Sequence, residues 1–277
     1  MFCRCFEPRS KATVATRGGT TTDSLAGAIE DTAEEVTQRG GHGFAVRCDH
    51  TVDEQVRALF ERVGREQGRL DLLVNNAWGG YESPGIPRVP FWKTPLRLWD
   101  AMFVAGLKAH LVASYFTVPL MLPRRRGLII STVAWDHDKY LNRPDHPNWG
   151  VGSFYDIAKH AIVRMIYALG IELRPHKIAA VAVAPGFMRT ERVLHFFKAD
   201  EQNWKKFPGL KRTETPEYVG RAVAALAADP RVLRKSGRAF HAGELAREYG
   251  FTDVDGRRVP PFTVPPFQQV LRKYYKE

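Results

Sequence analysis

The spacing of apolar residues changes repeatedly between residues 40 and 185. Longer stretches with apolar positions at helical spacing alternate with short apolar, β-branched runs at 44–46, 70–74, 127–131 and 178–183. This alternation is typical of βαβ units, in which helices connect parallel strands. The sequence therefore predicts an α/β fold built around a parallel sheet.

The regions on either side are less regular. We expect one weak strand at 12–16 and a helix near 29–36, while residues 185–216 carry Pro, Gly and aromatic residues without a clear period. That irregular stretch is long enough to form an active-site lid. A second helical pattern covers 218–226. We expect one domain over 1–250, with an atypical N-terminus at 1–11, followed by an irregular C-terminal tail at 251–277.

Composition narrows the class of protein. The chain has 277 residues, of which 44% are apolar, and this is enough for a large core. No apolar run approaches the roughly 20 residues that are needed to cross a bilayer. The N-terminal residues do not show the pattern of a signal peptide. We expect a soluble cytoplasmic protein with no membrane partner. The three cysteines form no disulfide or metal-ligand pattern, so no metal is expected. The net charge of +11 is scattered, and its tightest cluster, Arg124–Arg126, fits a solvated turn, which argues against a nucleic-acid partner.

The clearest candidate for chemistry is Tyr155, followed four residues later by Lys159. On a helix this spacing places the phenol and the ammonium on one face, about one turn apart. A nearby cation favours the phenolate and lowers the pKa of the phenol from about 10 toward the range useful for proton transfer. The same spacing also occurs by chance on helices, so the neighbouring motifs decide its meaning.

Two further motifs follow strands that are expected to be buried. An Asn-Asn-Ala turn follows the strand at 70–74, and a Pro-Gly turn with a nearby threonine follows the strand at 178–183. Ligands of open parallel sheets bind at the carboxyl ends of the strands. Each motif also suits an ordinary turn, so their order along the chain is the informative feature.

In this order the motifs resemble those of the short-chain dehydrogenase/reductase superfamily, over about residues 12–250. The matching residues are Asn75, Asn76 and Ala77, then Tyr155 with Lys159, then Pro185 and Gly186 with Thr190. The segment from Glu244 to Gly256 is similar to the dehydrogenase/reductase member 1-like group of that superfamily. The resemblance implies a Rossmann-like, doubly wound parallel sheet and an NAD(P)-dependent oxidoreductase.

The resemblance also implies roles for individual residues. Tyr155 would be the acid/base, Lys159 would hold the nicotinamide ribose and depress the phenol pKa, Asp49 would lie at the adenine, and Thr190 would hydrogen-bond the carboxamide. The implied cofactor-binding residues are Arg17, Asp49, Asn75, Asn76, Ala77, Tyr155, Lys159, Pro185, Gly186 and Thr190.

The largest departure from the family concerns the N-terminal region. The family opens with a strand and a Thr-Gly-x-x-x-Gly-x-Gly turn, whose backbone amides approach the pyrophosphate. No segment matches that turn, and Gly18-Gly19 fits the end of the family's second strand better. The first strand is apparently missing, so we expect the chain as written to bind NADP(H) poorly. In this alignment Arg17 lies where members that prefer NADPH carry a base, which favours NADP, with NAD as the alternative.

Two positions of the proton-transfer machinery also depart from the family. An ungapped match places Ala134 where the catalytic serine is expected, which leaves Ser131 as the first candidate to replace it and Thr132 as the second. Gly106 stands where many relatives carry an asparagine that anchors a relay water. A glycine there would either relieve packing or leave room for water.

These observations predict an oxidoreductase that moves a hydride between nicotinamide and a small-molecule carbonyl or alcohol. The aromatic residues between 187 and 204 fit either an apolar substrate pocket or the core of the lid, and the first interpretation predicts an apolar substrate. The alternative is a non-catalytic or truncated relative that binds a partner but no dinucleotide. The family resemblance further implies a homo-oligomer.

Overall fold

The computed structural model describes residues 28–79, 89–134 and 152–262. Within these ranges, four parallel strands form one sheet in the order β1-β2-β3-β4. The register aligns Asn75 with Ser131, and Ser131 with Ala182, so the carboxyl ends of neighbouring strands meet at one edge. The strands are β1 (Leu72–Asn75), β2 (Gly127–Thr132), β3 (Ile178–Ala184) and β4 (Arg238–His241).

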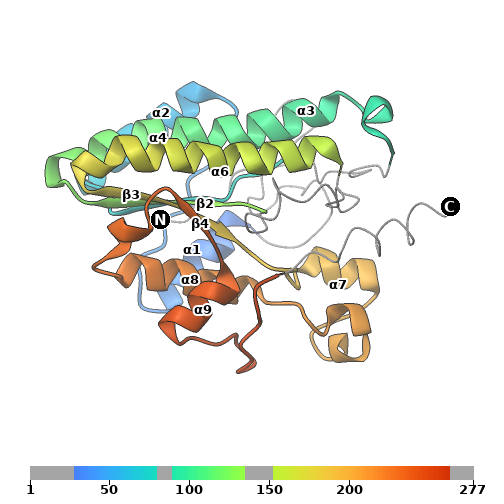
Figure 1. The fold of residues 1–277 in the computed structure, drawn as a ribbon. Coiled ribbons are helices and arrows are strands. Elements are labelled where there is room, and N and C mark those ends of the chain that lie inside the picture. The colour runs from blue at the N-terminus through green and yellow to red at the C-terminus, as the bar shows by residue number, and fades with distance from the viewer. Residues whose placement is uncertain (1–27, 80–88, 135–151, 263–277) are drawn as a thin grey trace.

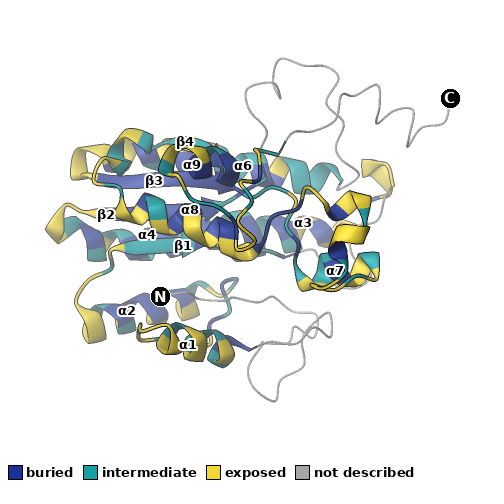
Figure 2. Cartoon of the chain, turned by 90° about the horizontal axis from the view of Figure 1, so that it is seen from below, coloured by how far each residue is buried: buried dark blue, intermediate teal, exposed yellow. Residues whose placement is uncertain are grey.

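Helices cover both faces of this sheet (Figure 1). The helices α4 (Ala109–Met121) and α6 (Ser153–Leu173) lie on one face, and α8 (Pro216–Ala228) and α9 (Ala242–Tyr249) lie on the other. Every residue of β3 is buried (Figure 2), which explains its continuous apolar sequence, since a covered parallel strand has no solvent face. The α/β, doubly wound class expected from the sequence is confirmed.

The remaining helices pack around this centre. The helix α3 (Arg97–Met102) runs into a π-helical stretch, Phe103–Lys108, and then directly into α4. Apolar residues of α2 pack against α4, and Lys108 Nζ lies 2.7 Å from Asp53 Oδ1. The other helices are α1 (Ile29–Gln38), α2 (Asp53–Gln67) and α7 (Glu191–Phe197), with short 3-10 turns at Phe91–Lys93, Leu122–Arg124, Arg174–His176, Trp204–Lys206, Pro208–Leu210 and Val232–Lys235.

One expected strand is wrong. Residues 44–46 have no regular secondary structure, and Phe44 is 60% exposed. A strand needs a hydrogen-bonded neighbour, and within the described ranges residues 44–46 pair with no strand, although β1 pairs with β2 alone and leaves one edge of the sheet free. The expected strand at 12–16 and the candidate Arg17 lie outside the described residues.

One continuous helical stretch, Arg97–Arg124, is long and apolar enough to cross a membrane by length and composition. In the most apolar 18 residues of this stretch, 44% of the window is buried inside the domain. Ala109, Ala113 and Met121 face inward on α4, and this packing accounts for the apolar character of a core helix.

The chain after α9 is irregular but packed. Residues 251–262 have no helix or strand, yet Asp253 and Val259 are buried. The hydroxyl of Tyr218 on α8 donates to the carbonyl of Val259 at 2.9 Å. This segment therefore covers the open side of α8.

Candidate functional site

The two asparagines after β1 have different surroundings. Asn75 is buried, and its side-chain amide donates to Ser114 Oγ at 3.1 Å and to the His110 carbonyl at 3.3 Å, which ties the end of β1 to α4. Asn76 is exposed at the carboxyl edge of the sheet, where its Oδ1 accepts a 2.7 Å hydrogen bond from Thr132 Oγ1. Asn76 is thus the member of the pair that can meet a ligand.

The helix α6 brings Tyr155 and Lys159 to one place. The Lys159 Nζ lies 5.8 Å from the centroid of the Tyr155 ring, which agrees with the one-turn spacing predicted from the sequence. Both side chains contact Trp78, which follows Ala77 at the end of β1. The Tyr155 ring meets the Trp78 ring edge-on, with the centroids 5.4 Å apart and the planes at 79°. The motif at 75–77 and the helix motif therefore border a common site.

The Lys159 ammonium lies over the face of Trp78, 3.6 Å from the ring centroid. The residue is only 7% exposed, and burial lowers the pKa of its ammonium to about 7. Lys159 can therefore change its charge near neutral pH, an uncommon property for a lysine. Groups with such altered pKa values occur preferentially at functional sites.

A buried histidine lies behind this pair. His110 on α4 is 1% exposed, and its Nε2 lies 2.9 Å from the Ala77 carbonyl, which can only accept, so Nε2 carries the proton. Burial, together with the nearby Lys159 charge, lowers the pKa of His110 to about 3. The ring is therefore neutral at physiological pH and fixes the Ala77 backbone. Nothing in the sequence pattern singled out this residue.

The turn after β3 is held by a buried carboxyl group. The Gly186 N–H donates to Glu214 Oε1 at 2.8 Å, and the backbone of Glu214 bonds to Phe187 and Arg189. A Cβ at position 186 would lie 2.7 Å from Glu214 Oε2, so glycine permits this approach. Burial raises the pKa of Glu214 to about 7, which Asp253 reinforces and the Gly186 hydrogen bond opposes. Sequence reasoning found the glycine and missed its partner.

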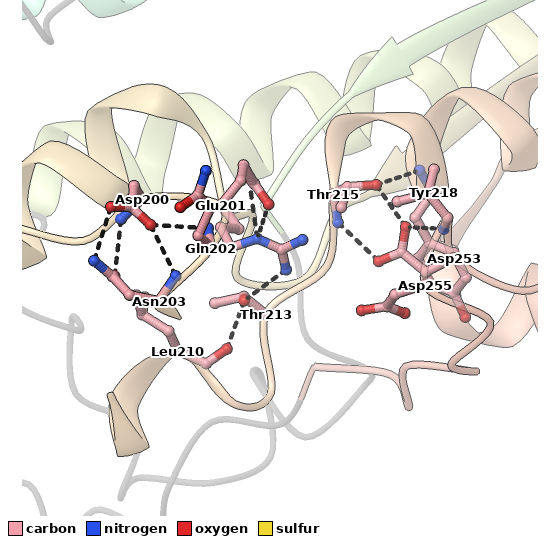
Figure 3. Close-up of polar contacts among 12 residues, drawn as sticks. Asp200, Glu201, Gln202, Asn203, Leu210, Thr213, Thr215, Tyr218, Asp253 and Asp255 are labelled. Carbon is pink, nitrogen blue, oxygen red and sulfur yellow. Dashed lines mark hydrogen bonds and ion pairs between the residues drawn. The ribbon is translucent and has the colours of Figure 1, made fainter. Parts of the chain in front are cut away.

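Polar contacts fix the segment that follows this turn (Figure 3). The Arg189 side chain is 3% exposed, donates to both carboxylate oxygens of Glu201, and lies 3.9 Å over Trp204. At the other end, the Thr215 N–H donates to Asp253 Oδ2 at 3.0 Å. Trp204 is consequently buried in the small core of this segment.

The remaining expected residues hold turns or lie inside the sheet. Thr190 caps α7, since its Oγ1 accepts from the Val193 N–H at 3.4 Å. Asp49 accepts from the N–H and hydroxyl of Thr51 ahead of α2. Ser131 is fully buried, and its Oγ has no hydrogen-bond partner in the described part of the chain. Thr132 is half-buried and bonds to Asn76, and Ala134 follows at the strand end.

The polar side chains of this site fit the nicotinamide–ribose half of a dinucleotide. A buried ammonium at Lys159 and an outward amide at Asn76 are hydrogen-bonding groups suited to ribose hydroxyls and a carboxamide. Among the residues described, no group of three or more His, Cys, Asp or Glu side chains is placed to hold a metal ion.

Comparison with known sequences places the chain among oxidoreductases. A family model described as enoyl-(acyl carrier protein) reductase matches residues 20–233. The chain is 35% identical over 242 residues to the dehydrogenase/reductase SDR family member 1 of Mus musculus, a match that covers 84% of this chain and 74% of that protein.

Solved structures share the fold. A short-chain dehydrogenase from Mycobacterium thermoresistibile has a TM-score of 0.69 at 22% identity, covering 85% of this chain and 77% of that one. An NADPH-dependent reductase involved in bacilysin biosynthesis has a TM-score of 0.59 at 22% identity, covering 77% and 81%.

Proposed function

Because the chain belongs to the short-chain dehydrogenase/reductase family of oxidoreductases, we propose that it interconverts a carbonyl and an alcohol with Tyr155 as the acid/base. The observation that carries the proposal is the arrangement of Tyr155 and Lys159 on α6, next to the motif that ends β1. A phenol can donate a proton to a carbonyl oxygen, and an ammonium beside it stabilises the phenolate that results.

Each residue has a separate task in this proposal. When bound, a nicotinamide cofactor would supply the hydride to the carbonyl carbon in the reduction and would accept it from the carbinol carbon in the oxidation. Tyr155 gives its phenolic proton to the carbonyl oxygen during reduction and takes it back during oxidation. Lys159 stabilises the phenolate electrostatically and donates to the ribose hydroxyls. Asn76 and the Pro185-Gly186 turn border the place of the nicotinamide.

A hydroxyl group beside Tyr155 would help to orient the carbonyl oxygen. Ser131 and Thr132 remain the two candidates. Thr132 is half-buried at the strand end and Ser131 is fully buried inside the sheet, which favours Thr132 as the group that a substrate can reach. This reverses the order given by sequence reasoning, because a strand alternates its faces and Ser131 points to the core.

We further propose NADP as the cofactor, on the strength of Arg17 alone, with NAD as the alternative. The substrate we propose is a small, apolar carbonyl or alcohol compound, since exposed Phe187 and Phe196 lie on the segment after β3. We also propose that the protein is cytoplasmic and that it binds neither a membrane nor a nucleic acid.

The proposal is tested with a panel of apolar ketones and aldehydes and either NADPH or NADH. The cofactor is used at millimolar concentration so that its binding does not limit the rate. Tyr155→Phe is expected to reduce kcat/KM at least about 100-fold, because the proton donor is removed, with little change in the Kd for cofactor. Thr132→Val and Ser131→Ala, compared in the same assay, identify the hydroxyl that assists.

Two results would contradict the proposal. Equal rates for the parent and Tyr155→Phe would rule out the phenol as proton donor. No carbonyl-dependent oxidation of either cofactor by the parent would instead support the alternative, a non-catalytic relative that binds a partner and no dinucleotide.

A further inference from the structure

The Lys159 ammonium is buried without an ordinary counter-charge. Within the described ranges, no carboxylate and no hydrogen-bond acceptor contacts its Nζ. The titratable groups around it are Tyr155 on its own helix and His110 on α4, and His110 is neutral at physiological pH. The group that faces the ammonium is the indole ring of Trp78, 3.6 Å away.

The fold makes room for this ring at Gly106. A Cβ at position 106 would lie 2.7 Å and 2.8 Å from Cζ3 and Cε3 of Trp78, so any other residue would displace the indole. Gly106 lies in the π-helical stretch between α3 and α4. Of the two explanations that the sequence allowed for this glycine, relief of packing is the one that the structure shows. Local π-helical turns are frequent at functional sites.

Apolar neighbours fix the ring on its other sides. Leu98 and Met102 on α3 are fully buried and form one cluster with Ala158, against which Trp78 and Tyr155 pack. The edge-on contact of Tyr155 with the indole has the geometry that aromatic pairs prefer. One ring therefore contacts both the proposed acid/base and the cation beside it.

We propose that Trp78 is a positioning residue of the active site, which holds the Lys159 ammonium against Tyr155 through a cation–π contact. This role rests on the function proposed above for Tyr155 and Lys159, whereas the contact itself can be tested without catalysis. The ring attracts the charged form of Lys159 and so opposes part of the desolvation that lowers the pKa of the ammonium to about 7.

The contact can be measured by NMR on the 277-residue chain labelled with 13C at lysine Cε. The Lys159 signal is identified by its loss in Lys159→Met. In the parent we expect this signal to have an upfield proton shift, because the end of the side chain lies over the face of an indole. Its titration midpoint is expected near the pKa of about 7.

Removal of the ring should change both readouts. Trp78→Leu is expected to abolish the upfield shift and to lower the midpoint by about one pH unit, since a desolvated cation–π contact favours the ammonium by roughly that amount. Trp78→Phe keeps a ring and should retain most of both effects. Trp78→Met gives the same comparison as Trp78→Leu with more of the space filled, should the leucine variant not fold.

Leu98→Ala is the matched control, because it removes apolar volume from the same cluster and leaves the indole. Its Lys159 midpoint should equal that of the parent. The proposal is overturned by a parent signal without the upfield shift, by a Trp78→Leu midpoint equal to the parent's, or by a Leu98→Ala midpoint lowered as much as that of Trp78→Leu.

The kinetic counterpart is the pH profile of carbonyl reduction. The pH at which kcat/KM falls should move down by about one unit in Trp78→Leu and should not move in Leu98→Ala. A parent protein that shows the NMR signature but no reductase activity would contradict the proposed function, and the titration would still establish the contact.

Discussion

Glu214 is a buried carboxyl group whose charge should affect stability. Burial raises its folded pKa to about 7 from the ordinary 4.5, so the folded chain binds more protons than the unfolded chain between these two pH values. The stability that this group contributes is fully present below pH 4.5 and is lost as the pH rises through about 7.

Glu214→Gln should therefore stabilise the protein more at pH 8.5 than at pH 5. The glutamine keeps an oxygen that can accept from the Gly186 N–H and stays neutral, and the difference between the two pH values is expected to be about 2 kcal/mol. Urea unfolding at both pH values measures it. The exposed Glu217→Gln, in the first turn of α8, also removes one carboxylate charge and serves as the control. An identical pH dependence for the two variants would contradict the account.

At the scale of residues, the sequence predicted the side chains that belong to recognisable motifs. It did not predict the side chains that contact them and hold them in place. Tyr155 and Lys159 were identified because helical spacing alone places them together. Trp78 and Glu214 were missed because their partners, at 159 and 186, are distant in the sequence and no local pattern predicts such contacts. Gly106 gave the one usable signal, since a glycine inside a helix indicates either close packing or a missing side chain.

At the scale of elements, α6 and the turn before β4 approach each other closely. A Cβ at Gly170 would lie 2.4 Å from the backbone N and Cα of Gly237, and backbone atoms cannot move aside as a flexible side chain can. Gly237 itself has a φ of +79°, a conformation that glycine adopts without strain. The pair therefore fixes how closely α6 lies on the sheet.

Gly170→Ala is expected to lower the free energy of unfolding by about 2 to 4 kcal/mol, because the added methyl group forces α6 away from β4. The matched control is Gly220→Ala in α8, where a Cβ meets nothing within 4 Å. That substitution should stabilise the protein by up to about 1 kcal/mol through helix propensity. Denaturant unfolding of both variants tests the contact, and two stabilised variants would refute it.

The elements themselves were predictable where their patterns were long or fully buried. The strands β1, β2 and β3 begin within two residues of their expected positions, since each is an apolar run bounded by turn residues. The strand expected at 44–46 was wrong because a run of three apolar residues does not indicate whether a neighbouring strand is present to pair with it. The strand β4 was not expected, because Arg238 and His241 interrupt its apolar character.

At the scale of the whole molecule, an exposed apolar face remains on the outer helices. Large apolar side chains that are 45% to 70% exposed occur along α4 and α6. Such a face on a protein in solution is typical of an interface between subunits. It agrees with the homo-oligomer that the family resemblance implies. The residues are Leu111, Tyr115, Ile157, Tyr167 and Ile171.

We therefore predict a dimer or larger assembly that is held together by this face. Tyr115→Glu should shift the protein toward the monomer, because a charge placed in an apolar interface loses its hydration. Phe196→Glu is the control, since Phe196 is 75% exposed on α7, away from α4 and α6. Analytical ultracentrifugation measures both. A monomeric parent, or an equal shift in the two variants, would show that this face is not the interface.

Transfer of deuterium from nicotinamide C4 to the product tests the central claim most directly. The parent chain is mixed with a carbonyl substrate and millimolar NADPH carrying deuterium at C4, on either face, and the alcohol is analysed by mass spectrometry. The account predicts deuterium on the carbinol carbon, formed at least about 100-fold more slowly by Tyr155→Phe. No deuterium in the alcohol formed by the parent, or equal rates for the two proteins, would contradict it.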